Sequence, residues 1–110
     1  MDHAPVDVQA TLAELTARSI ARAIERYCPH TREAFVCGGG ASNAHLMGRL
    51  AACLPAVAWA TTATLGMHPD WVEAAAFAWL ARETLAGRPG NLPAVTGACG
   101  PRILGCVYPA

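Results

Sequence analysis

Three consecutive glycines, Gly38, Gly39 and Gly40, followed by Ser42 and Asn43, are the residues of this chain best suited to hold a ligand. An apolar run before them predicts a short buried strand, and a helical pattern follows them. Glycine has no Cβ and reaches positive φ without strain, so the backbone can approach another molecule closely. The unpaired N–H groups at the start of a helix attract anions such as phosphate. Strand, glycine turn and helix start together predict an anion-binding site.

The glycine pattern by itself leaves a second interpretation open. It is not G-x-G-x-x-G, and it lacks the Gly-Lys-Ser/Thr ending of a Walker A loop. The glycines could equally form only a tight turn from strand to helix that requires positive φ. Ser42 and Asn43 are also favoured helix N-caps, so either could cap the helix, contact a ligand or do both.

Glu73 is the acid best placed to take part in catalysis. The pattern of residues 70–85 predicts a helix that is apolar nearly all round, and Glu73 falls in its first turn. One interpretation is an exposed carboxylate that the helix dipole stabilises. The other sets the carboxylate between Trp71, Val72 and Ala74, against packed surface, where it needs polar partners. There it could orient a water molecule or a substrate hydroxyl.

The cysteines and histidines carry weaker signals. Cys37 could act as a nucleophile only beside a base, and the sequence places no base there, so a cysteine-dependent enzyme is the weakest alternative. The four histidines show no metal-ligand spacing and predict no metal site. The five cysteines are odd in number and never spaced C-x-x-C, which predicts reduced, mostly buried thiols in a cytoplasmic protein.

Composition excludes several classes of protein. The chain has 110 residues, enough for one small domain, and its 54% hydrophobic content is that of a globular protein. Eight arginines balance eight acids and are scattered, which argues against a nucleic-acid binder. The sequence contains no apolar stretch of membrane-spanning length, and the first residues do not resemble a secretory signal.

The expected elements alternate between helix and strand. We expect an α/β fold with a short, mostly parallel sheet flanked by helices. Asp7 is the expected N-cap of the first helix, and Val8, Leu12 and Leu15 begin its core-facing stripe. Helices this apolar need partners on more sides than a narrow sheet offers, so the chain reads as one lobe of something larger. The expected elements are a helix over 7–27, a strand over 34–37, a helix over 43–54, a strand over 56–61, a helix over 70–85 and a strand over 103–107.

Several motifs together resemble one family. The Cys-Gly-Gly-Gly-Ala-x-Asn segment is similar to the adenosine-side glycine motif of sugar kinases in the actin and hexokinase superfamily. The motifs that follow are more specific and resemble the anhydro-N-acetylmuramic acid kinase family over nearly the whole chain. They are Thr61-Thr62, Leu65-Gly66, Val72-Glu73-Ala74, Phe77-Ala78-Trp79-Leu80-Ala81, the segment Gly90 to Ala98, and Ile103-Leu104-Gly105-x-Val107-Tyr108-Pro109.

The resemblance implies a partial actin-like lobe. Family members are about three times this length, and residues 1–110 resemble only their C-terminal lobe. The implied reaction is ATP-dependent phosphorylation of 1,6-anhydro-N-acetylmuramic acid at O6 with opening of the anhydro ring, in cytoplasmic recycling of cell-wall amino sugars. Gly38, Gly39, Gly40, Ser42 and Asn43 would contact ATP, and Glu73 would orient the sugar or the attacking water. The N-terminal lobe would supply the general base and the Mg²⁺ ligands.

Two interpretations of the function of this chain remain open. On the kinase reading the isolated chain is expected to be inactive, and the full-length protein could be a homodimer. The rival is a non-catalytic lobe or truncated relic that acts only as a binding module. Trp71, Phe77 and Trp79 are expected to pack in the core or between lobes, and the role of residues 91–98 stays undecided between ligand contact and connector.

Overall fold

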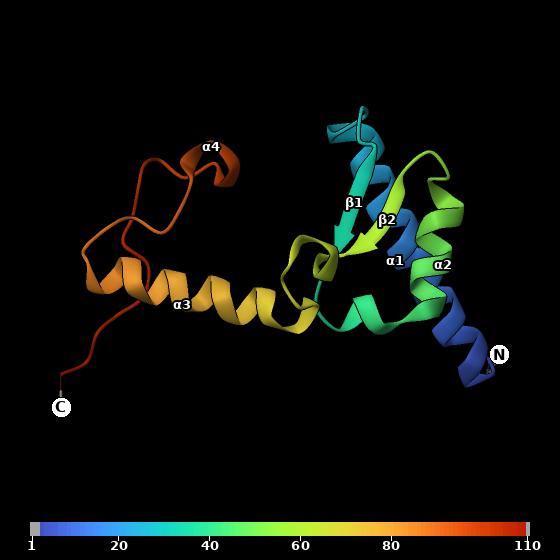
Figure 1. Cartoon of the computed structure of the whole chain (residues 1–110), viewed down its shortest axis with the longest axis horizontal. Coiled ribbons are helices and arrows are strands. Elements are labelled where there is room, and N and C mark those ends of the chain that lie inside the picture. The colour runs from blue at the N-terminus through green and yellow to red at the C-terminus, as the bar shows by residue number, and fades with distance from the viewer. Residues whose placement is uncertain (1–2, 110) are drawn as a thin grey trace. The chain divides into compact units, whose positions relative to one another are not determined.

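The computed structural model describes residues 3–109, and the chain divides into two compact units, residues 3–70 and 71–109. Figure 1 shows the order of the elements along the chain. The bounds are α1 Pro5–Tyr27, β1 Glu33–Val36, the 3-10 turn Gly39–Ser42, α2 Ala44–Cys53, β2 Ala58–Thr61, the 3-10 turns Thr62–Leu65 and Pro69–Trp71, α3 Val72–Leu85 and α4 Pro93–Thr96.

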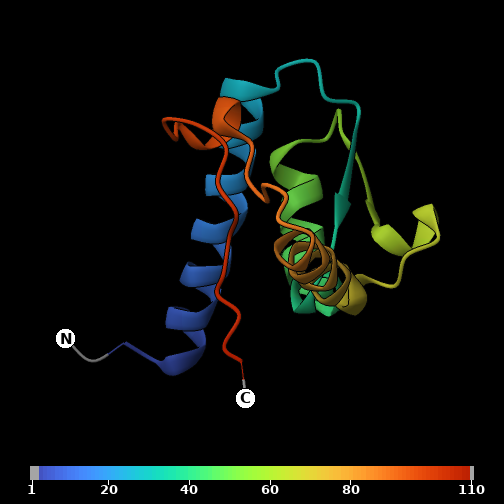
Figure 2. The same ribbon diagram turned by 90° about the vertical axis from the view of Figure 1, so that its left-hand side faces the viewer.

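The first unit is a two-stranded parallel sheet with both helices on one face. β1 pairs with β2 in parallel, with Glu33 opposite Ala58 and Val36 opposite Thr61. Figures 1 and 2 show α1 and α2 on the same side of the sheet, with α2 between the strands and α1. The expected α/β class is confirmed, as are the first two strands and the three long helices to within about two residues at most ends.

Two details of α1 differ from the sequence prediction. Asp7 is not the N-cap: Ala4 holds that position, Pro5 begins the helix, and Asp7 lies in the first turn, where the helix dipole favours an acid. The buried residues of α1 are Ala17 and Ala21, whereas Leu12 and Leu15 are more than half exposed. The expected stripe is wrong at its start because α1 packs against α2, and the residues that these two helices bury are Leu50 of α2 and the small alanines further along α1.

The expected third strand is also wrong. Residues 101–107 form no strand in the part of the chain that the structure describes. A strand exists by hydrogen-bonding to a neighbouring strand, and within the described residues this segment has none. Gly105 interrupts the apolar run at φ 90, and the Leu104 carbonyl accepts a hydrogen bond from the Thr84 hydroxyl instead.

In the second unit, polar groups hold a loop-rich C-terminal segment against α3. Glu83 is only 6% exposed, and Arg88 pairs with it at 2.6 Å, which fastens the chain that leaves the end of α3. The Asn91 side chain accepts from the Arg102 backbone N–H at 2.6 Å and donates to the Gly100 carbonyl at 3.2 Å. Asn91 therefore closes the loop that leads through α4.

No helix among residues 3–109 combines the length and apolarity needed to cross a bilayer.

An ion-pair cluster ties α1 to α2. Glu14 of α1 accepts from Arg49 of α2 at 2.6 Å and from Arg18, one turn along α1, at 2.7 Å. Hydrogen bonds from Arg49, and secondly from Arg18, hold the pKa of Glu14 down to about 2. A carboxylate with a lowered pKa stabilises the fold above its unfolded pKa, and that contribution is lost as the pH falls toward the folded value.

We predict that Glu14→Gln flattens the acid dependence of stability. The unfolding free energy of the unaltered chain should fall between about pH 4.5 and 2, and the variant should lose part of that fall. Urea unfolding followed by circular dichroism across this range measures it. Glu25→Gln is the control, because Glu25 lies on the same helix and makes no ion pair with another described residue. Equal pH dependence in Glu14→Gln and the unaltered chain would contradict the role given to this cluster.

Candidate functional site

The candidate site lies at the carboxyl edge of the two-stranded sheet. Because β1 and β2 run in parallel, their carboxyl ends meet at one edge. β1 leads through Cys37 into the glycine turn, and β2 leads directly into the 3-10 turn Thr62–Leu65. The carboxyl edge is where open parallel sheets bind ligands. The fold thus sets a glycine turn beside a threonine turn.

Gly38 is required by the backbone itself. Its φ of 70 and ψ of −169 fall in a region that is essentially restricted to glycine. Its N–H donates to the Pro69 carbonyl at 2.9 Å, and its carbonyl accepts from the Ala41 N–H at 3.0 Å. The interpretation of the glycines as a tight turn is therefore confirmed at Gly38.

Gly39 and Gly40 have no such requirement within the chain. Neither has positive φ. A Cβ on Gly39 would meet nothing within 4 Å, and one on Gly40 would make an ordinary contact of 3.6 Å with Leu46. Their N–H groups open the 3-10 turn and donate no hydrogen bond to any described residue. The packing of the chain therefore does not explain why these two residues are glycines.

Asn43 caps α2, as the sequence predicts. Its side-chain oxygen accepts from the Leu46 N–H at 3.1 Å. Ser42 differs in position: it ends the 3-10 turn Gly39–Ser42, which separates the glycines from α2, and its side chain is exposed. The glycine turn, Ser42 and the start of α2 thus form one continuous polar segment.

The threonine turn is a part of this edge that sequence reasoning did not include among the site residues. The Thr62 hydroxyl is buried and makes no hydrogen bond with another described residue, and the same holds for the indole N–H of Trp59 on β2. Thr64 instead donates to the Thr61 carbonyl at 2.9 Å and closes the turn. The signal that could have found it is the threonine pair Thr61-Thr62 where an apolar strand ends.

A groove in the first unit adjoins the glycine turn. It has a volume of about 600 Å³ and is lined by the first turns of α1 and by Asn43, His45 and Leu46 of α2. Leu46 is also the neighbour of Gly40, so the groove reaches the turn. Its walls are mainly apolar, and its size is that of a small-molecule site.

Glu73 belongs to the second unit and lies in the first turn of α3. Its side chain is exposed, as is that of the adjacent Trp71, so within the described residues the interpretation as an exposed first-turn carboxylate holds and the packed one does not. The packed interpretation fails because the second unit is small and leaves most of α3 exposed. The carboxylate makes no hydrogen bond with another described residue, which leaves both oxygens open to a ligand.

The cysteines differ from their prediction. All five are free, and four of them are exposed, Cys53 being the partly covered one. The expectation of mostly buried thiols is wrong because the described chain encloses only a few apolar side chains, none of them a cysteine. Among residues 3–109 no group of three or more His, Cys, Asp or Glu side chains could hold a metal ion.

Comparison with known proteins assigns the family. The family model described as anhydro-N-acetylmuramic acid kinase matches residues 1–110. The chain belongs to this family. The family kinase of Thiobacillus denitrificans is 61% identical over 96% of this chain, and that of Xanthomonas campestris is 59% identical over the same share. The kinase of Nitrosospira multiformis is 54% identical over 99%.

The chain spans less than a third of the length of the curated relatives that it matches. It covers 28% of the Thiobacillus denitrificans and Xanthomonas campestris kinases and 30% of the Nitrosospira multiformis kinase. The resemblance drawn from the motifs of the sequence is confirmed for the family.

We predict that alanine at Gly38 and at Gly39 has opposite consequences for folding. Gly38→Ala should cost about 1–3 kcal/mol of unfolding free energy, because alanine is strained at that φ and ψ. Gly39→Ala should leave stability unchanged or raise it by about 0.4–1 kcal/mol, since it restricts the unfolded chain without a clash. Urea unfolding of both variants measures the difference. A loss in Gly39→Ala as large as that in Gly38→Ala would show that Gly39 is also structural.

Proposed function

We propose that this chain is the C-terminal part of an anhydro-N-acetylmuramic acid kinase with an actin-like fold. In this proposal it supplies the adenosine side of the ATP site and one acid, and an N-terminal lobe closes the cleft. The observation that carries the proposal is the family match over residues 1–110, together with two glycines that the chain's own packing does not require.

The glycine turn would bind ATP through its backbone. The N–H groups of Gly39 and Gly40 donate no hydrogen bond to another described residue, so they are available to a ligand. The absence of a Cβ would let the ribose and α-phosphate approach the backbone closely. Asn43 caps α2 and Ser42 is exposed, so Ser42 can donate to an anion beside the positive end of the α2 dipole. Gly38 would hold the turn in shape, with the Pro69 carbonyl as its partner.

The groove beside Asn43 would receive the nucleoside. It begins at Leu46, next to Gly40, and its mainly apolar walls suit the faces of a base. His45 lines the same groove and offers a ring nitrogen for a polar edge. A nucleoside here and its phosphates at the glycine turn would follow one continuous surface of the first unit.

Glu73 would act on the sugar. In the proposed reaction water adds to C1 of 1,6-anhydro-N-acetylmuramic acid as the C1–O6 bond breaks. The released O6 then takes the γ-phosphoryl group, which leaves ADP, and a base accepts the proton of the water. The Glu73 carboxylate, free of partners within the described chain, would orient that water or a sugar hydroxyl. The base itself is expected in the N-terminal lobe.

Mg²⁺ commonly accompanies ATP in phosphoryl transfer, where it neutralises charge on the phosphates. The residues described here provide no group of carboxylates able to hold it. We therefore assign the Mg²⁺ ligands to the N-terminal lobe and give this chain no part in holding the ion. A cytoplasmic place in amino-sugar recycling is part of the same proposal.

We predict that Gly39→Val weakens ATP binding without unfolding the protein. The test protein is a chimera in which this chain replaces the matching 28% of the Thiobacillus denitrificans kinase. The valine side chain would occupy the space through which the nucleotide approaches, so the Kd for ATP should rise at least about tenfold. Isothermal titration calorimetry measures this.

The matched control for that experiment is Gly48→Val. Gly48 lies on α2, outside the glycine turn, and a Cβ there also meets nothing within 4 Å. It should bind ATP as the unaltered chimera does. Equal ATP affinity in Gly39→Val and Gly48→Val would remove the nucleotide role of the turn.

We predict that the chimera phosphorylates the anhydro sugar, that the 110-residue chain alone does not, and that Glu73→Gln slows the chimera. The amide keeps the size of the side chain but orients water less well than a carboxylate, so kcat should fall about 10²-fold or more. Steady-state assays with ATP and 1,6-anhydro-N-acetylmuramic acid measure it, with Glu25→Gln as the control. Undiminished kcat in Glu73→Gln would refute the role of this acid, and turnover by the chain alone would refute the need for a second lobe.

A further inference from the structure

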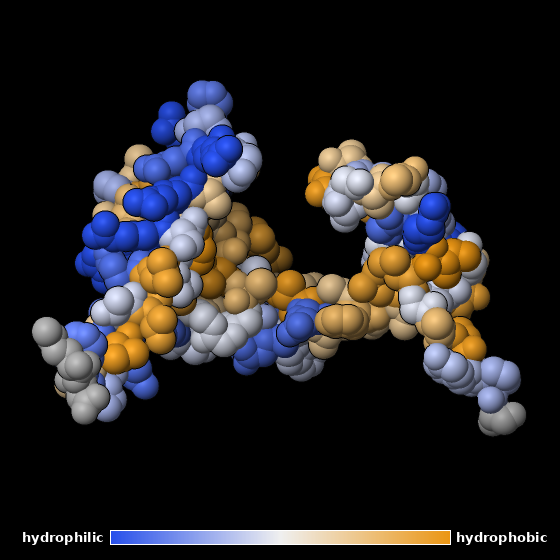
Figure 3. All heavy atoms as spheres, turned by 180° about the vertical axis from the view of Figure 1, so that it is seen from behind, coloured by the Kyte–Doolittle hydropathy of each residue, from blue (hydrophilic) through white to orange (hydrophobic). Residues whose placement is uncertain are grey.

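The second unit has its burial pattern inverted. The one buried residue of α3 among those described is Glu83, at 6% exposure, while Phe77 is 63% and Leu85 75% exposed on the same helix. In a self-contained domain the apolar side chains are covered and the acids face water. Figure 3 shows apolar residues gathered on the surface of this unit. Clustered exposed apolar side chains are typical of a surface that contacts another molecule.

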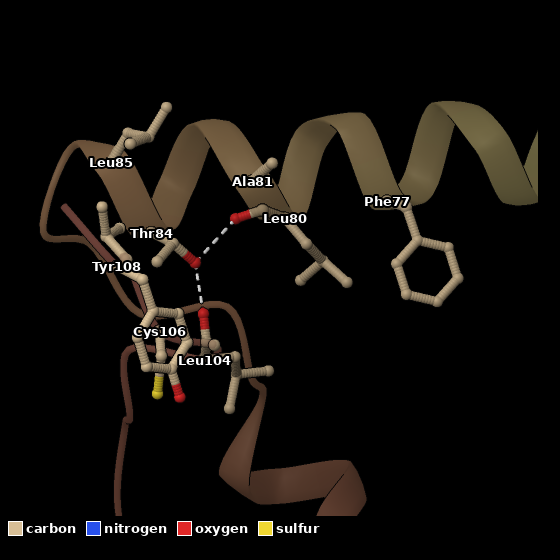
Figure 4. A pocket seen from close by; sticks show the side chains of 10 residues that line it. Phe77, Leu80, Ala81, Thr84, Leu85, Leu104, Cys106 and Tyr108 are labelled. Carbon is tan, nitrogen blue, oxygen red and sulfur yellow. Dashed lines mark hydrogen bonds between the residues drawn. The ribbon is translucent and has the colours of Figure 1, made fainter. Parts of the chain in front are cut away.

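The exposed surface is shaped as a groove along α3. The C-terminal segment from Leu104 to Tyr108 runs beside the helix, and the two line an open groove of about 710 Å³. Figure 4 shows Phe77, Leu80 and Leu104 around it, with Cys106 and Tyr108 on the segment.

One of the two side-chain hydroxyls that line the groove, that of Thr84, is already hydrogen-bonded. The Thr84 hydroxyl is hydrogen-bonded to the carbonyls of Leu80 and Leu104, and Figure 4 draws both bonds. The other hydroxyl belongs to Tyr108, which is 86% exposed, and the remaining lining side chains are apolar apart from the Cys106 thiol. An apolar side chain could therefore enter the groove without leaving the Thr84 hydroxyl unpaired. The groove therefore suits a hydrophobic element of a protein better than a nucleotide or a sugar.

The greater length of the relatives offers a candidate for the protein element that the groove binds. A kinase 61% identical to this chain continues for nearly three quarters of its length beyond the matched part. We propose that the groove formed by α3 and residues 104–108 seats an apolar element of that remaining polypeptide, the N-terminal lobe of the kinase. This inference depends on family membership and does not depend on the assignment of the ATP site.

Cys106 makes the proposal measurable, because it is exposed and lines the groove. Variants that retain Cys106 as their single cysteine within these 110 residues, with the others replaced by serine, would be prepared as the isolated chain and as the chimera. Thiol labelling is expected to be at least about tenfold slower in the chimera, since a covered thiol must await opening. Introducing Phe77→Asp into the chimera should restore fast labelling, and Ala23→Asp on the exposed side of α1 should not.

Three outcomes separate the possibilities. Equal labelling rates in the isolated chain and the chimera would overturn the proposal. Slow, concentration-dependent labelling of the isolated chain, with a dimer mass in light scattering, would overturn it in favour of a second copy. If the chimera is insoluble, a cysteine placed at the matching position of the intact Thiobacillus denitrificans kinase must be slow to label, and fast labelling there would overturn the proposal. Gly39→Val should leave the protection intact, so failure of the ATP site and failure of this interface are distinguishable.

Discussion

The parallel pairing of β1 with β2 is the interaction on which the candidate site depends. Parallel strands end at the same edge, so the register from Glu33–Ala58 to Val36–Thr61 delivers the glycine turn and the threonine turn side by side. The Gly38 N–H donates to the Pro69 carbonyl. This bond ties the glycine turn to the segment that follows the threonine turn. Without this pairing Gly38 would have no reason to hold its unusual backbone conformation.

The second constraint is that the described chain buries few of its apolar side chains. The described chain buries only Ala17, Ala21, Leu50 and Val57 among its apolar residues, and it holds its helices with ion pairs: Glu14 with Arg49 and Glu83 with Arg88. An arginine pair fixes geometry well but contributes less to stability than a packed core. The chain therefore has well-directed polar contacts and incomplete hydrophobic ones, which is the pattern expected of part of a larger fold.

Sequence reasoning succeeded where the signal is local. The glycine turn, the Asn43 cap and the long helices follow from backbone preferences that act over a few residues, and the family follows from motifs. It failed where burial or strand pairing depends on tertiary contacts with residues distant in the sequence. Leu12 was predicted to lie in the core but is more than half exposed. Residues 103–107 were predicted to form a strand but pair with no strand among the described residues. The cysteines were predicted to be mostly buried, but four of the five are exposed. The buried Thr62 hydroxyl was missed for the same reason, since its surroundings are tertiary.

The same scarcity of buried apolar side chains bears on how Glu73 could be positioned for catalysis. A carboxylate that orients water must be held to within a fraction of an ångström, which an exposed helix end does not achieve alone. At the other end of α3, the ion pair between Glu83 and Arg88 holds the last turn of the helix. Glu83 lies ten residues, or about 15 Å of helix, from Glu73. A helix is stiff over that length, so fixing its apolar side against another polypeptide would also fix its first turn. Under the proposed function, the packing of α3 in the groove would set how precisely Glu73 is positioned.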